Sequence, residues 1–240
     1  MVTGGLSLLL SAVTVAAAKA PSQAKRGYTS TIWCGPILYG NYFKTVEASW
    51  TIPNVSLPTG GDENEDYFSS QWVGIDGSGA KENGDCTALL QAGTSIGYSQ
   101  GDIWHYSWTE FFPAETGNID LDFKVGDEIY VKLTATSKTT GDVYMLNKST
   151  GQKATQQMTA PEGKELCFRS VEWIEEDPGG GLPFPAFETF RFTGAAAKNS
   201  EGEAFNLKGS EIVSMVQDGQ TLCEPTIESD SIVKFEYKGK

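Results

Sequence analysis

Hydrophobic and polar residues alternate along most of this chain in short runs. This two-residue period predicts β-strands in which one face is buried. The clearest runs cover 128–135 and 232–237. Shorter runs of the same kind cover 47–52, 71–75, 88–91, 103–111, 142–147, 171–176, 189–193 and 212–217. Outside the N-terminal segment we find no helical period, so the pattern predicts an all-β protein.

Turn-forming residues separate these runs, as at Gly60-Gly61-Asp62, Thr140-Gly141-Asp142 and Asp218-Gly219. Many short strands joined by turns are typical of an antiparallel sandwich or barrel. The chain has 240 residues, a length that suits one domain with a sizeable core. With roughly a dozen strands in one domain, we predict an antiparallel β-sandwich of two large packed sheets.

The first 26 residues differ from the rest of the chain. An alanine-rich apolar stretch at 8–18 is too short for a transmembrane helix and is typical of a signal-peptide core. Lys25-Arg26 then has the form of a dibasic processing site. We therefore predict a signal peptide and short pro-segment over 1–26, followed by one β-sandwich domain over 27–240. The mature protein is expected to be secreted and extracellular.

The formal net charge is −13. Nucleic acids and anionic membranes are bound by clustered Lys and Arg, so we expect neither as a partner. We expect a monomer. The acidity fits two explanations equally well. It provides solubility, and it also suits a protein that works in acid, where carboxylates are neutral and repel each other less.

Four cysteines in a secreted chain predict two disulfides, with three possible connectivities. No Cys-x-x-Cys pair occurs, so we expect no zinc site, and no other metal or cofactor is indicated. Asn54 and Asn147 each begin an Asn-x-Ser sequence, which predicts glycosylation of a secreted protein.

Most catalytic machinery is absent from the sequence. The chain has a single histidine, His105, so a serine or cysteine triad would lack a suitably placed base. The run Gly93-Thr94-Ser95-Ile96-Gly97 matches G-x-S-x-G, but no helix is predicted after it, as a nucleophile elbow requires. There is no His-Glu-x-x-His run for a zinc protease. Carboxylates and amides are the candidates that remain.

Three such side chains lie in aromatic or apolar strand contexts: Gln91, Glu110 and Glu172. In a peptidase, Glu172 would take a proton from the attacking water, and the Gln91 amide would donate to the developing oxyanion. In a glycoside hydrolase, Glu110 and Glu172 would be the two carboxylates. In a carbohydrate-binding sandwich without catalysis, strand aromatics would stack on sugars. The residue types alone leave these hypotheses open.

Ordered motifs around these residues narrow the choice. They are Trp72-Val73-Gly74-Ile75-Asp76-Gly77, then Cys86 followed by Leu90-Gln91-x-Gly93, then Glu172-Trp173-Ile174-x-Glu176-Asp177. Together they resemble the eqolisins, the fungal glutamic peptidases, over about 31–237. The resemblance implies a sandwich of two seven-stranded antiparallel sheets and acid endopeptidase activity on proteins or peptides. It also implies a catalytic dyad of Gln91 and Glu172.

The resemblance extends to further residues. Five match positions that line or support the family's cleft: Trp33, Trp72, Asp76, Trp108 and Glu110. Cys86 and Cys167 match a family disulfide, which would join the strand of Gln91 to the strand of Glu172.

The chain also departs from the family pattern. Thr109, Phe111 and Phe112 replace the Tyr, Trp and Tyr of the usual Trp-Tyr-Glu-Trp-Tyr-Pro sequence. Ser95 occupies a position where some members have an acidic residue. Cys34 and Cys223 have no family counterpart, so they either pair with each other or leave one thiol free.

Overall fold

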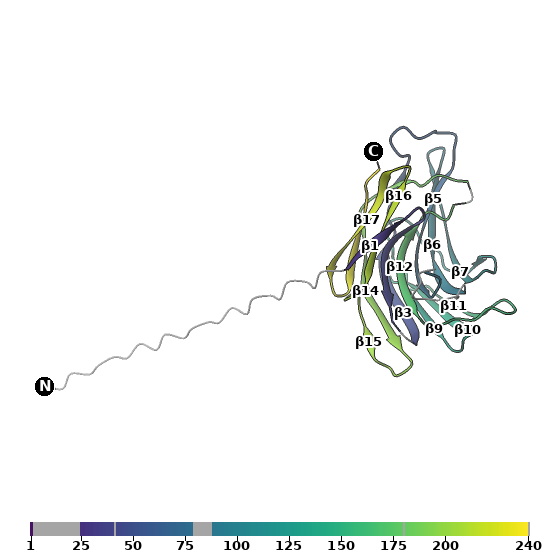
Figure 1. Ribbon diagram of the computed structural model, residues 1–240. Helices are drawn as coiled ribbons and strands as arrows, with labels where there is room; N and C mark the ends of the chain where they lie inside the picture. Colours follow the sequence, from purple (N-terminus) through teal and green to yellow (C-terminus); the bar gives the residue numbers. More distant parts are fainter. Residues whose placement is uncertain (2–24, 41, 79–87, 180, 240) are drawn as a thin grey trace.

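The computed structural model describes residues 1, 25–40, 42–78, 88–179 and 181–239. Within these ranges the chain forms strands and turns and no helix (Figure 1). The strands are β1 (Lys25–Ser30), β2 (Trp33–Tyr39), β3 (Phe43–Thr51), β4 (Val55–Ser56), β5 (Tyr67–Ile75), β6 (Leu89–Ser99), β7 (Asp102–Phe112), β8 (Gly117–Asn118), β9 (Glu128–Ala135), β10 (Thr140–Asn147), β11 (Lys153–Thr159), β12 (Ser170–Glu176), β13 (Ala186–Phe187), β14 (Phe190–Asn199), β15 (Ala204–Phe205), β16 (Glu211–Gln217), β17 (Gln220–Ser229) and β18 (Ile232–Tyr237). A search of the described residues for a long apolar helix able to span a membrane finds none.

Hydrogen bonds connect sixteen of these strands into one sheet. Its order is β11-β10-β9-β3-β14-β18-β17-β16-β2-β12-β5-β6-β7-β8, with β1 beside β16 and β15 beside β14. β13 and β4 form a separate pair. The pairing of β1 with β16 is parallel, and the other described pairs are antiparallel. The predicted all-β antiparallel class is therefore confirmed.

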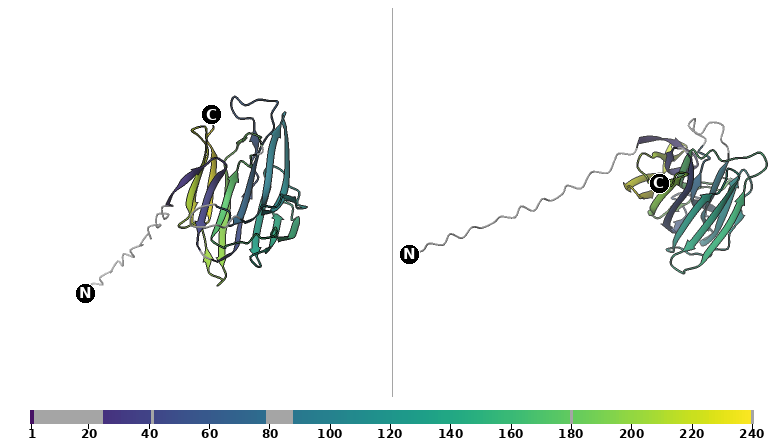
Figure 2. Two further views of the ribbon diagram at one scale, coloured as in Figure 1. Left: turned by 45° about the vertical axis from the view of Figure 1, so that its right-hand side comes forward. Right: turned by 90° about the horizontal axis from the view of Figure 1, so that it is seen from below.

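The expectation of two separate seven-stranded sheets is wrong for this structure. β16 bonds to β17 on one side and to β2 on the other, so the hydrogen-bond ladder runs on from one half of the molecule into the next. The sheet then curls back on itself, because β3 packs on β5 and β12, and β9 packs on β5 and β6 (Figure 2). The two halves face each other as the layers of a sandwich do.

The main hydrophobic core fills the space between the two halves. Stacked and edge-on aromatic pairs dominate it, such as Trp50 on Phe192 at 4.7 Å and Phe190 on Phe235 at 5.0 Å between ring centroids. Each such side chain contributes about 1.5–3 kcal/mol when fully buried. A second, smaller cluster lies on the other face of β5, β6, β7 and β12. β5, β6 and β12 are therefore buried on both faces for much of their length.

A disulfide joins Cys34 on β2 to Cys223 on β17. The two cysteines without a family counterpart thus pair with each other. Cys86 lies outside the described residues, so the expected Cys86–Cys167 bond stays a prediction, although Cys167 itself is disulfide-bonded.

Each predicted alternating run coincides with a strand, which confirms the runs, although three of them extend one residue beyond the strand, at Ile52, Ala88 and Thr189. The predicted turn at Thr140-Gly141-Asp142 is wrong, because these residues begin β10. Gly141 has a packing role there: any side chain at this position would collide with Leu90.

Two predictions concern processing. Residues 2–24 of the expected signal and pro-segment lie outside the described residues, and Lys25 already begins β1. Glycosylation of Asn147 is wrong for the folded chain, because its side chain is fully buried. The nitrogen that would carry the glycan, Nδ2, donates to Asp122 O at 3.0 Å and Asp127 Oδ2 at 2.9 Å. The sequence at Asn54 stays a prediction.

Candidate active site

Sheet register brings the candidate residues into one row. Glu172 on β12 lies opposite Gly74 on β5, Gly74 lies opposite Gln91 on β6, and Gln91 lies opposite Glu110 on β7. Directly opposite residues point to the same face of a sheet. Glu172 and Gln91 are therefore two strand spacings apart, about 10 Å between Cα atoms. Only a glycine separates them.

The absence of a side chain at Gly74 creates space between the amide and the carboxyl. A Cβ atom there would approach Glu172 Oε2 at 3.2 Å, Trp72 Cζ3 at 2.7 Å and Leu89 Cδ1 at 2.9 Å. The Glu172 carboxyl therefore leans over Gly74, with Trp72 and Leu89 beside it. A small group held above Gly74 would lie between the functional groups of Glu172 and Gln91.

A cleft of about 390 Å³ opens on this face of the sheet. Its lining includes Trp33, Gln91, Tyr106, Trp108, Glu110 and Glu176. Glu172 is fully buried beside the cleft, and Leu89, which lines the cleft, also packs above Gly74. Trp72 is fully buried under the cleft wall, in the small cluster with Trp108.

Several buried polar atoms in this region have no hydrogen-bond partner within the part of the chain that the structure describes. Gln91 Nε2 donates to Glu110 Oε2 at 2.7 Å, while Gln91 Oε1 and Trp108 Nε1 have no partner among the described residues. Neither oxygen of Glu172 meets hydrogen-bond geometry with a described donor. Buried polar groups are nearly always paired in folded proteins. A concentration of unpaired ones beside a cleft indicates a site that a ligand completes.

The carboxyls of the row have raised pKa values. Burial raises the pKa of Glu172 well above 4.5; the nearby Ser170 hydroxyl lowers it, and the Asp76 carboxylate raises it further. Burial also raises the pKa of Glu110, opposed by hydrogen bonds from Gln91 and Thr116. Both groups therefore hold a proton more tightly than free glutamate does. An ionised Glu172 would be a correspondingly stronger base.

Asp76 positions the strand that carries Glu172. Its fully buried carboxylate accepts four backbone N–H groups, from Cys167 at 2.7 Å, Phe168 at 2.7 Å, Arg169 at 2.6 Å and Ser170 at 3.3 Å. These residues lead directly into β12. Asp76 therefore contacts backbone, not the cleft, and holds the start of β12 against the end of β5.

Glu176 is a carboxyl of the cleft that sequence reasoning did not single out. Its Oε1 accepts from Trp33 Nε1 at 2.9 Å and its Oε2 from Trp72 Nε1 at 2.7 Å. The two rings meet edge to face at 5.1 Å. Burial raises the pKa of Glu176 to about 7, although the two indole hydrogen bonds lower it. The alternation of β12 carried a signal for it, since Glu176 lies four residues after Glu172 on the same face.

A second carboxyl–amide pair lies on the opposite, core-facing side of the sheet. Gln71 Nε2 donates to Glu175 Oε2 at 2.8 Å, and Thr94 Oγ1 donates to Gln71 Oε1 at 3.2 Å. Trp50 Nε1 from the facing half donates to Thr94 at 3.0 Å. Glu175 is fully buried, and burial raises its pKa to about 8, helped by the nearby carboxyls of Glu176 and Asp177. Hydrogen bonds from Gln71 and Ser69 oppose this rise.

The raised pKa of Glu175 predicts that the folded protein loses stability as pH rises. The folded state keeps the Glu175 proton up to about pH 8, whereas a free glutamate releases it near 4.5. Stability is then greatest below the lower value and falls by about 1.4 kcal/mol per pH unit between the two. We expect the melting temperature, followed by circular dichroism, to fall by several degrees across this window. Glu175→Gln should flatten the decline.

Glu162→Gln is a matched control, because it removes the same formal charge from an exposed position. It should leave the slope of melting temperature against pH unchanged. A wild-type melting temperature that climbs toward neutral pH would contradict this account of the core.

Comparison with known proteins identifies the family of this chain. The model of the peptidase A4 family matches residues 31–237. Aspergillopepsin-2 of Aspergillus niger is 31% identical over 221 residues, covering 85% of this chain and 76% of that protein. Scytalidopepsin B of Scytalidium lignicola is 29% identical over 221 residues, covering 88% of this chain and 79% of that protein.

Solved structures of similar proteins come from the same family. Scytalido-glutamic peptidase in complex with a peptide-based transition-state analogue superposes with a TM-score of 0.73 at 28% identity, covering 86% of this chain and 98% of that one. Aspergilloglutamic peptidase from Aspergillus niger gives a TM-score of 0.65 at 32% identity, covering 71% and 99%. These matches confirm the resemblance: the chain belongs to the peptidase A4 family, the eqolisins, whose members are glutamic peptidases.

Proposed function

We propose that this protein is a secreted acid endopeptidase in which Glu172 and Gln91 are the catalytic dyad. The observation that carries the proposal is the row across β12, β5 and β6, in which a buried carboxyl and an amide flank the side-chain-free position of Gly74. The Glu172 oxygens meet hydrogen-bond geometry with no described donor, which supports a role toward a ligand that enters this space. Family membership supports a peptide as that ligand.

The proposed reaction begins with the scissile carbonyl held above Gly74. Glu172 takes a proton from a water molecule, whose oxygen attacks the carbonyl carbon. The carbonyl oxygen becomes an oxyanion and accepts a hydrogen bond from Gln91 Nε2. Glu172 then gives its proton to the amide nitrogen, the C–N bond breaks, and a carboxylic acid and an amine leave. Each turnover consumes one water and returns Glu172 to its starting state.

Glu110 has a positioning role in this proposal. Gln91 Nε2 carries two hydrogens, and the 2.7 Å bond to Glu110 Oε2 occupies one of them. The second hydrogen is then free to point at the oxyanion. Fixing the amide orientation in advance lowers the reorganisation needed in the transition state. Trp33 and Trp108 would form walls against which the substrate rests, with the buried Trp72 behind them.

The carboxyls around the cleft support a decline of activity toward neutral pH. Glu110, Glu172 and Glu176 all have raised pKa values, and the Glu110 charge is one cause for Glu176. No Lys or Arg belongs to the described lining. Ionising all three together would therefore place uncompensated like charges around one cleft. We expect activity once one proton has left this cluster, so that Glu172 can carry the charge and act as the base, and a decline toward neutral pH as a second carboxyl ionises.

The remaining parts of the proposal concern the protein as a whole. We propose peptide or protein substrates, a monomer, removal of a signal and pro-segment over about 1–26, and a Cys86–Cys167 bond. A structure of the eqolisin SCP-B in complex with the tripeptide Ala-Ile-His supports peptide binding in this fold. The predicted signal-peptide core at 8–18 supports an extracellular location.

The test offers the purified protein acid-denatured protein and soluble polysaccharide, separately, at about pH 4 and near neutrality, on either side of the glutamate pKa shifts. We expect new peptide termini in acid, far fewer near neutrality, and no sugar release. Release of reducing sugar without peptide cleavage would instead assign Glu110 and Glu172 to a glycoside hydrolase. Binding of polysaccharide without either product would favour a carbohydrate-binding sandwich.

A further inference from the structure

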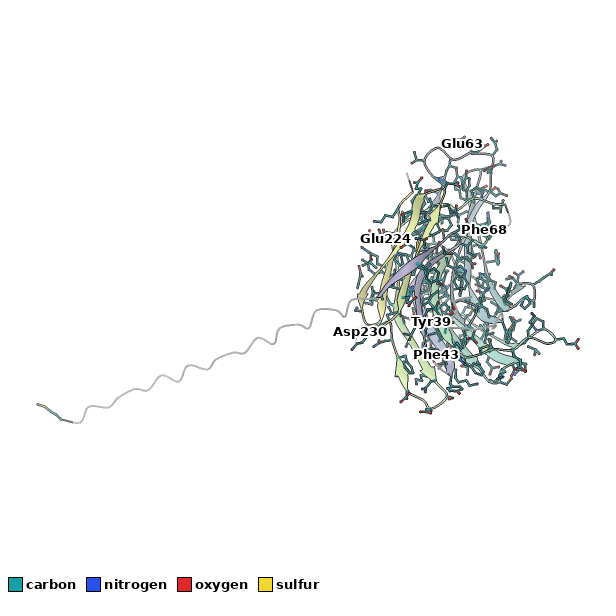
Figure 3. The ribbon with its side chains drawn as sticks, viewed as in Figure 1. Tyr39, Phe43, Glu63, Phe68, Glu224 and Asp230 are labelled. Carbon is teal, nitrogen blue, oxygen red and sulfur yellow. A yellow bond between two sulfur atoms is a disulfide. The ribbon has the colours of Figure 1, made fainter. Side chains whose placement is uncertain are left out.

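An aromatic strip begins at the wall of the cleft and continues along the same face of the sheet. It consists of Phe68 on β5 and Trp104 and Tyr106 on β7. Trp104 and Tyr106 stack with ring centroids 6.0 Å apart and an interplanar angle of 7°. Phe68 and Trp104 meet at 5.7 Å. Phe68 is labelled in Figure 3, on the side of the molecule where Figure 1 shows β5, β6 and β7.

Register places the aromatic strip on the same face as Gln91 and Glu110. Residues 104, 106, 108 and 110 alternate along β7 with residues of the opposite face, and Tyr106 and Trp108 both line the cleft. Tyr106 lies opposite Ser95, and Trp104 lies opposite Gly97, which in turn lies opposite Phe68. A side chain at Gly97 would collide with the Trp104 ring, so the glycine lets this ring lie flat over β6.

We propose that the aromatic strip is an extended substrate subsite that binds large apolar side chains of a peptide four to six residues from the scissile bond. The inference rests on the proposed function, because it takes the peptide substrate as the occupant. Tyr106 and Trp104 lie four and six residues from Glu110 along β7, about 14 Å and 20 Å at the rise of a strand. An extended peptide that lies along β7 has the same rise. Its alternate side chains therefore match the spacing of the rings.

The neighbours of the rings favour an apolar side chain over a sugar. Sugars bound by aromatic rings also need polar groups that bind their hydroxyls. Across the sheet, Trp104 faces Gly97 and Phe68, and none of these three side chains is charged. In the next row, the hydroxyls of Ser70 and Ser95 bond to each other at 2.6 Å. Tyr106 is 36% exposed, so its ring is available to a ligand.

The experiment measures binding separately from turnover. The full-length protein carrying Glu172→Gln is titrated by calorimetry with an eight-residue blocked peptide, with Leu or Phe at alternate positions, and with its four-residue central part. We expect the longer peptide to bind about tenfold more tightly, as stacking on one or two rings supplies. Tyr106→Ala or Trp104→Ala should remove most of that advantage.

His105→Ala is the matched control, because His105 lies between the two rings in sequence and points to the other face, where its ring meets Phe123 at 4.7 Å. It should preserve the length advantage. Tyr106→Ala affects a partly exposed ring, so it tests the strip even if Trp104→Ala disturbs folding. Equal affinities for the long and short peptides, or a length advantage that survives Tyr106→Ala, would overturn the proposal. Ring-dependent binding of a gluco-oligosaccharide in place of the peptide would overturn it too.

Turnover of the same peptides by the wild-type protein separates this inference from the proposed function. Ring-dependent binding without any cleavage would refute the proposed peptidase function but not the proposed subsite. Cleavage whose efficiency does not depend on Tyr106 or Trp104 would refute the proposed subsite but not the proposed peptidase function.

Discussion

Replacing Glu172 by glutamine is expected to lower kcat/KM for peptide hydrolysis by about a thousandfold or more, within the range that a positioned general acid–base supplies. The substitution keeps the size of the side chain, so packing above Gly74 changes little. It removes the group that takes and returns the proton, because an amide cannot do either near pH 4. The measurement is steady-state cleavage of a quenched fluorescent peptide in acid.

Glu175→Gln is the matched control for this prediction. Glu175 lies on the same strand, is also fully buried, and faces the opposite side of the sheet. Its replacement should leave kcat/KM in acid within about twofold of wild type. Gln91→Ala, which removes the oxyanion donor, should lower kcat/KM by about a hundredfold to a thousandfold. If Glu172→Gln cleaves as fast as Glu175→Gln, Glu172 is not the base.

Replacing Asp76 by alanine is expected to destabilise the fold by at least about 3 kcal/mol. The change leaves four backbone N–H groups at residues 167–170 without their acceptor, and each buried donor left unpaired costs about 1–3 kcal/mol. Asp76→Asn should cost less, because its amide oxygen still accepts from some of them. Urea unfolding followed by tryptophan fluorescence in acid gives both values.

The control for this prediction is Asp66→Ala, at an exposed carboxyl just before β5. It should change stability by less than about 0.5 kcal/mol. If Asp76→Ala is as stable as Asp66→Ala, the carboxylate does not hold the start of β12. Since β12 carries Glu172, we also expect surviving Asp76→Ala protein to show reduced kcat.

The strands that could be predicted are those with one buried and one solvated face. β9 alternates without exception between buried and half-buried residues, and its pattern was visible in the sequence. β11 was missed because it is an edge strand whose residues alternate only between exposed and half-buried. β2 and β17 were missed because Pro36 and Pro225 suggest turns. Both prolines nevertheless lie within paired strands.

The extents of β5 and β6 could not be predicted from periodicity. Both strands are longer than the runs at 71–75 and 88–91, because both of their faces are buried, one by the core and one by the cleft cluster. Burial on both faces removes the alternation that marks a strand. The continuity of the sheet also could not be predicted from the sequence, because it depends on long-range pairing of β16 with β2.

The candidate site was only partly accessible from the sequence. The motifs named Gln91 and Glu172, but the space between them depends on Gly74, whose position opposite both residues comes from register. Asp76 was expected to line or support the cleft, and its role in binding four backbone amides needed coordinates. Glu176 could have been found from its period on β12. Nothing in the sequence could show that its two oxygens hold Trp33 and Trp72.

The position of a bound transition-state analogue tests the central claim most directly. A crystal structure of this protein with a peptide that carries a tetrahedral, hydroxyl-bearing centre should place that centre above Gly74. One of its oxygens should lie within about 3 Å of the Glu172 carboxyl and another within about 3 Å of Gln91 Nε2, as hydrogen bonds require. An analogue whose tetrahedral centre binds between Glu110 and Glu176, or away from Gly74, would contradict the account.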